Sequence, residues 1–146
     1  MLFADDDPAI RGSFARAVKG AGYDVDLAED GSVALQRARE HKYSVFAMDF
    51  DMPGQAGVEL VRQLRELQPQ ASLIVITGDP EYAIESTKQK GVFMVISKPW
   101  EHDTLLTILD AASRRVERVA SGERGVVRAV PSPFAVARAT FGRRIG

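Results

Sequence analysis

The sequence predicts an α/β fold, a doubly wound five-stranded parallel sheet with helices on both faces. Apolar runs of strand length alternate along the chain with amphipathic runs of helix length. The apolar runs around residues 46, 75 and 95 carry no charge, which is typical of strands buried on both faces. Gly, Pro or Asp follows these runs and marks the turns between elements.

The first strand is predicted at residues 2–4, and the first helix begins at Pro8. A proline suits the first turn of a helix, and the acidic residues just before it are favoured at a helix N-terminus. Apolar residues spaced by four give this helix its inner face, and glycines end it. These residues are Ile10, Phe14, Val18, Gly20 and Gly22.

The second and third strands are predicted at residues 25–28 and 44–48, with a helix between them from Gly31 to about residue 42. The third strand ends abruptly in Asp49, so this carboxylate lies at the carboxyl end of a buried strand, where open α/β sheets keep their sites. Taken alone, Asp49 fits a turn or helix-capping aspartate equally well. The inward residues of the helix are Val33, Leu35 and Ala38.

The remainder of the chain continues the same alternation. A helix that begins after Gly57 faces the core with Val58, Val61 and Leu64. Leu105, Leu106, Leu109 and Ala112 form the apolar face of the last helix. The other elements are expected at residues 73–77 (strand), 81–90 (helix), 92–97 (strand) and 102–118 (helix).

Right-handed crossovers and the commonest doubly wound arrangement give the strand order 2-1-3-4-5. Strands 1 and 3 then lie side by side, and the acids that follow them, Asp5, Asp6 and Asp49, emerge in one crevice. Two carboxylates about 4 Å apart repel by about 4 kcal/mol at an effective dielectric near 20. Such a cluster therefore predicts a bound cation, and hard oxygen ligands suit Mg²⁺.

The 146 residues, with a formal charge of -1, predict one main domain at residues 1–120 and a short extension at 121–146. This near-zero net charge argues against a positively charged surface over the whole chain that would bind nucleic acid or membranes. The absence of cysteine excludes a disulfide, a thiolate zinc site and a cysteine nucleophile. Without a signal-peptide pattern, we expect a cytoplasmic location.

Four motifs, in this order and at these strand ends, resemble the receiver domains of two-component response regulators, which have a flavodoxin-like fold. The resemblance covers about residues 2–118. The motifs are Asp5-Asp6-Asp7-Pro8, the block from Asp49 through Met52-Pro53 to Gly57, Thr77-Gly78, and Lys98-Pro99. In this family the peptide bond that corresponds to Lys98–Pro99 is cis.

The resemblance implies that Asp49 accepts a phosphoryl group from a phosphohistidine on a sensor histidine kinase or phosphotransfer protein. It implies Mg²⁺ bound directly by Asp6 and Asp49, through water by Asp5, and by the backbone carbonyl of Asp51. The domain would be a switch and not an enzyme, with self-phosphorylation and autodephosphorylation as its only activities.

Lys98 and Thr77 complete the implied site. Lys98 would offset the charge of the transferring group, and Thr77 would hydrogen-bond a phosphoryl oxygen and draw its loop toward the site. Receivers commonly carry Tyr or Phe three residues before the lysine, where this chain has Val95. The aromatic half of the usual switch is therefore missing at that position, and Phe93 and Trp100 are the nearest substitutes.

The extension at 121–146 contains five arginines and one acid, too short a segment for an output domain. We interpret it as a flexible or partner-docked tail, or as part of a linker to an output domain. The resemblance also allows a homodimer. We expect no membrane partner and no nucleic acid contact for the receiver itself.

Two other functions fit parts of the pattern. A receiver can bind partners without phosphorylation; Asp49, Thr77 and Lys98 count against this function, while Val95 leaves it open. Asp49-Phe50-Asp51 also reads as the Asp-x-Asp of haloacid-dehalogenase-type phosphatases. Those enzymes place it after their first strand, whereas here it follows the third.

Overall fold

A computed structural model describes residues 1–120, and the extension predicted at 121–146 lies outside the described residues. Strands and helices alternate strictly through this part of the chain. The strands are β1 (Leu2–Ala4), β2 (Asp26–Ala28), β3 (Val45–Asp49), β4 (Ser72–Thr77) and β5 (Met94–Ser97). The helices are α1 (Pro8–Gly20), α2 (Gly31–Glu40), α3 (Gly57–Leu67), α4 (Pro80–Ser86) and α5 (His102–Ala120).

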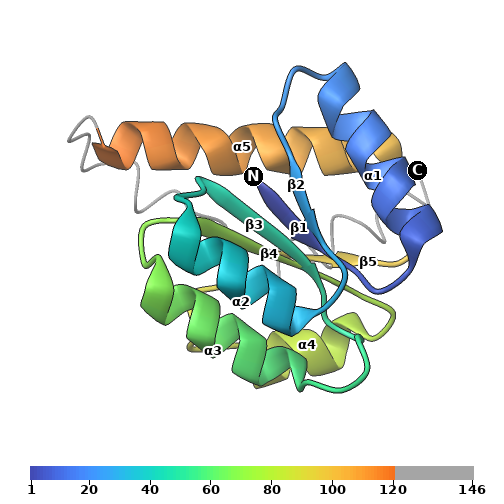
Figure 1. Ribbon diagram of the computed structural model, residues 1–146, viewed down its shortest axis with the longest axis vertical. Helices are drawn as coiled ribbons and strands as arrows, with labels where there is room; N and C mark the ends of the chain where they lie inside the picture. Colours follow the sequence, from blue (N-terminus) through green and yellow to red (C-terminus); the bar gives the residue numbers. More distant parts are fainter. Residues whose placement is uncertain (121–146) are drawn as a thin grey trace.

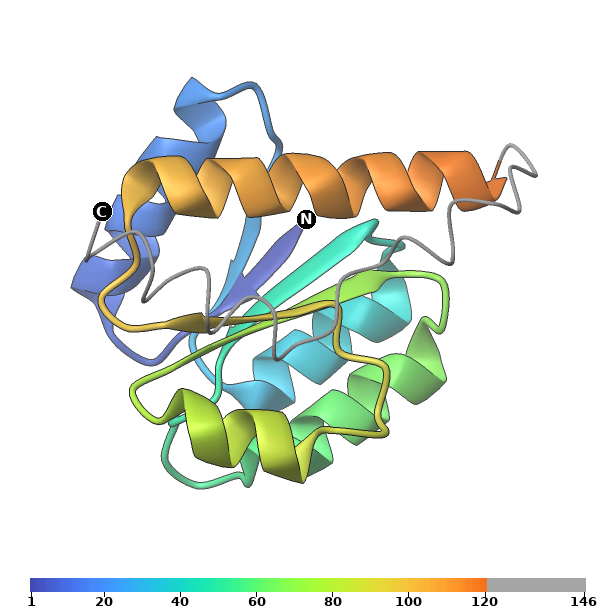
Figure 2. The ribbon, with the colours of Figure 1, turned by 180° about the vertical axis from the view of Figure 1, so that it is seen from behind.

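The five strands form one sheet in the order β2-β1-β3-β4-β5, and every neighbouring pair is parallel. This confirms the predicted strand order. Helices α1 and α5 cover one face, while α2, α3 and α4 cover the other (Figures 1 and 2). None of the described helices combines the length and apolar character that crossing a membrane requires.

Three helices of the described chain begin after an aspartate whose side chain caps the first turn. Asp7 accepts a hydrogen bond from the Ala9 N–H, and Asp30 and Asp79 accept from the N–H three residues downstream. Such caps satisfy backbone donors that have no partner within the helix. The caps explain why α1 and α2 begin where the sequence predicts, at Pro8 and Gly31.

The core lies in two layers, one on each face of the sheet, because alternate strand residues point to opposite faces. In β3, Val45 and Ala47 join the layer beneath α1 and α5. Phe46 and Met48 join the layer beneath α2, α3 and α4. All four side chains are buried, as expected for a central strand of a parallel sheet.

Three aromatic rings tie β1, α1 and the segment after β5 together. Phe3 and Phe14 stack with their ring centroids 3.8 Å apart. Trp100 meets Phe14 edge to face at 5.9 Å, a geometry that aromatic pairs prefer. Trp100 is thereby fixed at the carboxyl end of the sheet.

The fourth helix ends earlier than the sequence predicts, at Ser86 and not near residue 90. The Ser86 hydroxyl donates to the Tyr82 carbonyl at 2.7 Å, and the Thr87 hydroxyl donates to the Ala83 carbonyl at 2.6 Å. Hydroxyls of this kind compete with the helical hydrogen bonds and favour termination. The chain then turns through Gly91, whose φ is +72°.

The inner face of α3 also differs from the prediction by one residue. Leu60, Val61 and Leu64 are its buried residues, while Val58 is only partly buried. At the start of the helix, Gly57 lies against Phe50, and a Cβ added to this glycine would come within 2.5 Å of the ring. A side chain at this position would therefore clash with Phe50, so the close packing of the first turn requires glycine.

Candidate functional site

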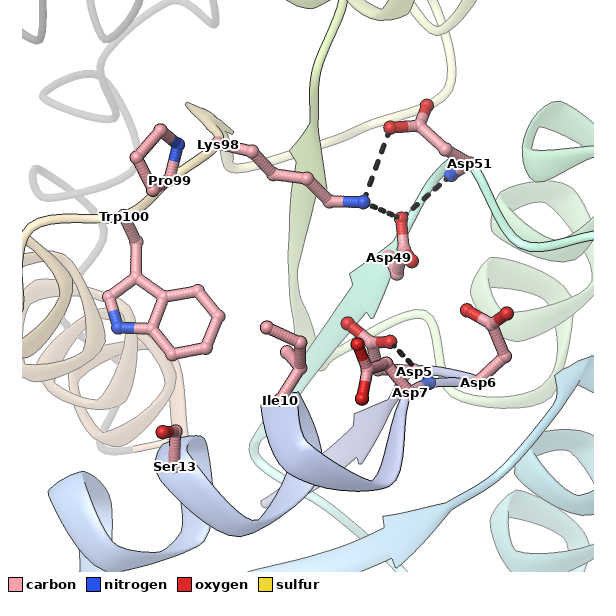
Figure 3. A pocket seen from close by; sticks show the side chains of 10 residues that line it. All are labelled: Asp5, Asp6, Asp7, Ile10, Ser13, Asp49, Asp51, Lys98, Pro99 and Trp100. Carbon is pink, nitrogen blue, oxygen red and sulfur yellow. Dashed lines mark hydrogen bonds and ion pairs between the residues drawn. The ribbon is translucent and has the colours of Figure 1, made fainter.

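The residues singled out by sequence meet at the carboxyl edge of the sheet. Asp5 and Asp6 follow β1, Asp49 ends β3, Thr77 ends β4 and Lys98 follows β5. Most of them line a cavity of about 590 Å³ whose rim includes Trp100 (Figure 3). Four strands far apart in the sequence thus contribute to one site.

Three carboxylates lie together in this pocket, as the strand order predicts. One oxygen of each of Asp5, Asp6 and Asp49 lies within 4.8 Å of the others. Asp5 and Asp49 are buried, with 3% and 4% of their surface exposed, whereas Asp6 is open to solvent. The Asp7 N–H donates to Asp5 at 2.9 Å and fixes its carboxylate.

The crowding of these carboxylates changes the acidity of Asp5. Burial raises its pKa to about 6, and the charges of Asp49 and Asp6 add to the rise, while the Asp7 N–H and Lys98 oppose it. Asp5 therefore holds its proton more firmly than an ordinary carboxyl group. A cation placed among the three carboxylates would lower the pKa of Asp5 again.

Lys98 supplies positive charge to the pocket. Its Nζ donates to Asp49 Oδ1 at 2.8 Å and lies 3.4 Å from Asp51 Oδ2. Partial burial favours the neutral amine, but the two carboxylates outweigh it and raise the pKa of Lys98. The Lys98–Pro99 bond is cis, as the family resemblance implies.

The side chain of Asp51 has contacts that the sequence analysis did not predict. The Thr77 hydroxyl donates to Asp51 Oδ1 at 2.9 Å, and the Gly78 N–H donates to Oδ2 at 2.8 Å. Although partial burial opposes ionisation, these donors and Lys98 lower the pKa of Asp51. The family resemblance implied a role for the backbone carbonyl of this residue alone. The signal available in the sequence was a second acid two residues after Asp49.

Thr77 is fully buried at the end of β4. Besides donating to Asp51, its hydroxyl accepts a hydrogen bond from the Asp79 N–H at 3.0 Å. The first contact ties the end of β4 to the loop after β3, and the second ties Thr77 to Asp79, the residue that caps α4. The sequence-based expectation that Thr77 contacts a phosphoryl oxygen stays a prediction, because its hydroxyl is bound to Asp51 in this structure.

Val95 is fully buried in the layer beneath α2, α3 and α4. The two aromatic residues considered as its substitutes, Phe93 and Trp100, belong to the opposite layer, beneath α1 and α5. Neither can fill space that opens next to Val95. The aromatic ring of α4 is Tyr82, which is 59% exposed and lies 6.1 Å from the Phe50 ring.

The carboxylate cluster has the donor chemistry of a site for a hard divalent cation. All three groups supply oxygen, which Mg²⁺ prefers, and neither histidine nor cysteine belongs to the cluster. Lys98 neutralises only part of the charge, because its ammonium faces Asp49 and Asp51. Asp5, Asp6 and Asp49 therefore fit the predicted metal.

Comparison with protein families gives a match to the response regulator receiver domain over residues 1–110. The transcriptional regulatory protein FixJ of Bradyrhizobium diazoefficiens is 31% identical over 121 residues, which are 82% of this chain and 58% of FixJ. The chain thus spans little more than half the length of this relative.

Solved structures give the same result. A CheY-like response regulator receiver domain protein from Methanospirillum hungatei superimposes with a TM-score of 0.75 at 25% identity, covering 80% of this chain and 94% of that one. A response regulator protein from Burkholderia pseudomallei, with a phosphorylated aspartic acid, calcium ion and citrate, has a TM-score of 0.70 at 26% identity. The match covers 84% of this chain and 73% of that one.

Proposed function

Because the chain belongs to the response regulator receiver domain family, we propose that it accepts a phosphoryl group on Asp49 and signals through the resulting change of shape. The observation that supports this proposal most directly is the environment of the Asp49 carboxylate. It is buried, it accepts a hydrogen bond from Lys98, and it lies beside Asp5 and Asp6.

In the proposed step, a carboxylate oxygen of Asp49 attacks the phosphorus of a phosphohistidine. The new P–O bond forms as the P–N bond breaks, and the electron pair of that bond goes to the imidazole nitrogen, which takes a proton. Lys98, which is ion-paired with Asp49, would offset negative charge on the transferring group. The rate then depends on positioning and charge, since phosphoryl transfer needs little other help from the protein.

Mg²⁺ is the proposed cofactor. Asp6 and Asp49 would hold it directly, Asp5 through water, and Asp51 through its backbone carbonyl. The ion supplies positive charge that offsets the charge of the phosphoryl oxygens. The structure of the Burkholderia pseudomallei response regulator, which contains a phosphorylated aspartic acid and a calcium ion, is compatible by analogy with a divalent cation as cofactor.

The proposed partners are a sensor histidine kinase or phosphotransfer protein as donor, and an output domain or second protein as the recipient of the signal. FixJ is a transcriptional regulatory protein, and this chain matches only 58% of it. Homodimerisation and a cytoplasmic location remain part of the proposal.

The test is phosphorylation by acetyl phosphate with Mg²⁺, followed by intact mass spectrometry. We expect one phosphoryl group per chain, lost in Asp49→Asn and retained in Asp110→Asn, which changes an exposed carboxylate of α5. An unmodified wild-type chain would favour a receiver that binds partners without phosphorylation. Sustained hydrolysis of p-nitrophenyl phosphate that disappears in Asp49→Asn would favour a phosphatase.

A further inference from the structure

Three polar donor groups from two segments of the chain converge on the side chain of Asp51. The Thr77 hydroxyl and the Gly78 N–H come from the end of β4, and the Lys98 ammonium follows β5. Their distances to the carboxylate oxygens are 2.9, 2.8 and 3.4 Å. Both oxygens of Asp51 are engaged.

A hydroxyl, a backbone N–H and an ammonium that point at one place make a receptor for an oxyanion. Here the oxyanion is supplied by the chain itself. The receptor also borders the phosphoacceptor, because Lys98 Nζ bonds to Asp49 Oδ1 at 2.8 Å and the Asp51 N–H bonds to the same oxygen at 2.9 Å. An anion attached to Asp49 would therefore lie beside the Lys98 ammonium, one of the donors that Asp51 contacts.

We propose that the Asp51 carboxylate is a tethered occupant of the phosphoryl-binding position, which must leave before Thr77, Gly78 and Lys98 can bind a phosphoryl group on Asp49. This inference rests on the proposed function. It assigns to the Asp51 side chain a regulatory role separate from that of its backbone carbonyl. The occupant lowers the rate and extent of phosphorylation and keeps the end of β4 bonded to the loop after β3.

The structure indicates which partner moves. The Asp51 side chain is 41% exposed and stands in the loop between β3 and α3, so it can turn into water without opening the core. Thr77 is fully buried, and Gly78 contributes a backbone group. Asp51 can therefore leave without exposing Thr77 or opening the core around it.

The matched variants are Asp51→Asn and Asp7→Asn. Both residues line the same cavity, and each change removes one negative charge with an isosteric amide. Asp7 contacts none of the three donors, and an asparagine can still cap α1. Asp51→Ala removes the occupant completely and leaves its backbone carbonyl unchanged.

The first measurement is the initial rate of phosphorylation by acetyl phosphate at saturating Mg²⁺, using the full chain. We expect Asp51→Ala to be faster than wild type by about tenfold, the factor that corresponds to ~1.4 kcal/mol. Asp51→Asn should lie between them, and Asp7→Asn should stay within about twofold of wild type. Equal rates for the Asp51 and Asp7 variants would contradict the inference.

The second measurement does not require phosphorylation. Inorganic phosphate is titrated against each variant while the amide resonance of Gly78 is followed by NMR. We expect Asp51→Ala to bind phosphate about tenfold more tightly than wild type or Asp7→Asn, with a shift at Gly78. If it does so while wild type takes no phosphoryl group, the proposed function fails and the assignment of Asp51 as occupant stands. No gain in phosphate binding would overturn that assignment.

Discussion

The pocket has two halves that meet at Asp49 and differ in how their charges are balanced. In the half beside β1, Asp5, Asp6 and Asp49 crowd together, and burial with mutual repulsion raises the pKa of Asp5 to about 6. In the half beside β4 and β5, Asp51 accepts hydrogen bonds from its neighbours and its pKa is lowered. The negative charge of the first half is only partly balanced by Lys98, whereas the Asp51 carboxylate in the second half has a donor for each oxygen.

The two halves should therefore respond to ligands in different ways. A cation can enter the first half by relieving repulsion that already exists, with little rearrangement. As proposed above, a phosphoryl group on Asp49 enters the second half by displacing Asp51. Phosphorylation then favours the form in which Asp51 is released, to the extent that the phosphoryl group binds that form more tightly. Metal binding should stabilise the existing fold, whereas phosphorylation should change it.

The response to metal should be the strongest. Mg²⁺ at about 100 times its dissociation constant should stabilise the fold by about 2.7 kcal/mol, which raises Tm by about 10 °C for a domain of this size. Asp6→Ala should remove most of this rise because it deletes a proposed ligand. Glu29→Gln, a change at an exposed residue that does not line the pocket, should keep it. Calorimetry with and without Mg²⁺ measures both. An undiminished rise in Asp6→Ala would place the metal elsewhere.

A smaller effect should follow from the pKa of Asp5 in the absence of metal. The folded protein keeps this proton to about pH 6, while the unfolded chain loses it near 3.8, so the fold binds more protons between these values. The contribution of Asp5 to the free energy of unfolding therefore falls as the pH rises through this window. Asp5→Asn should raise Tm by several degrees near neutral pH and by progressively less toward about pH 4.

Thermal unfolding in a metal chelator at several pH values checks this expectation. Glu29→Gln serves as the control because it removes one exposed carboxylate without relieving the crowding in the pocket. A gain in Asp5→Asn that stays constant from acidic to neutral pH would show that the proton on Asp5 is not its cause.

The smallest expected effect is the spread of a conformational change from Thr77 and Asp51 to the rest of the domain. Val95 is buried, β-branched and stiff, so it cannot swing as an aromatic ring does. With beryllofluoride as the aspartyl-phosphate mimic, hydrogen exchange should change mainly at Thr77, Gly78 and α4. Thr77→Ala should abolish this response while leaving Asp49 phosphorylation largely intact.

Thr107→Ala, which removes an exposed threonine of α5, should preserve the exchange response. Equal changes along Val95, Ile96 and α5 would mean that the missing aromatic ring does not limit the signal.

The sequence pattern, together with the commonest doubly wound arrangement, predicted the sheet order and the meeting of Asp5, Asp6 and Asp49, and the family resemblance added Lys98. Burial patterns identify strands, and parallel strands bring their carboxyl ends together whatever the side-chain details. The contacts of Asp51 could not be predicted, because they join groups 26 or more residues apart through rotamers that no periodicity reports. The end of α4 was missed because hydroxyl-to-backbone bonds at Ser86 and Thr87 outweigh its weak amphipathic pattern.

The assembly of the pocket from four strand ends also bears on folding kinetics. The Lys98–Asp49 bond joins residues 49 positions apart, and Asp5 reaches the same cavity from β1. Contacts between such distant residues form slowly and close only when the strands have paired. If the strands are not fully paired in the transition state for folding, that state has no complete site to bind Mg²⁺. Its main kinetic effect would then be to slow unfolding, lengthening the lifetime of the native state without accelerating its formation.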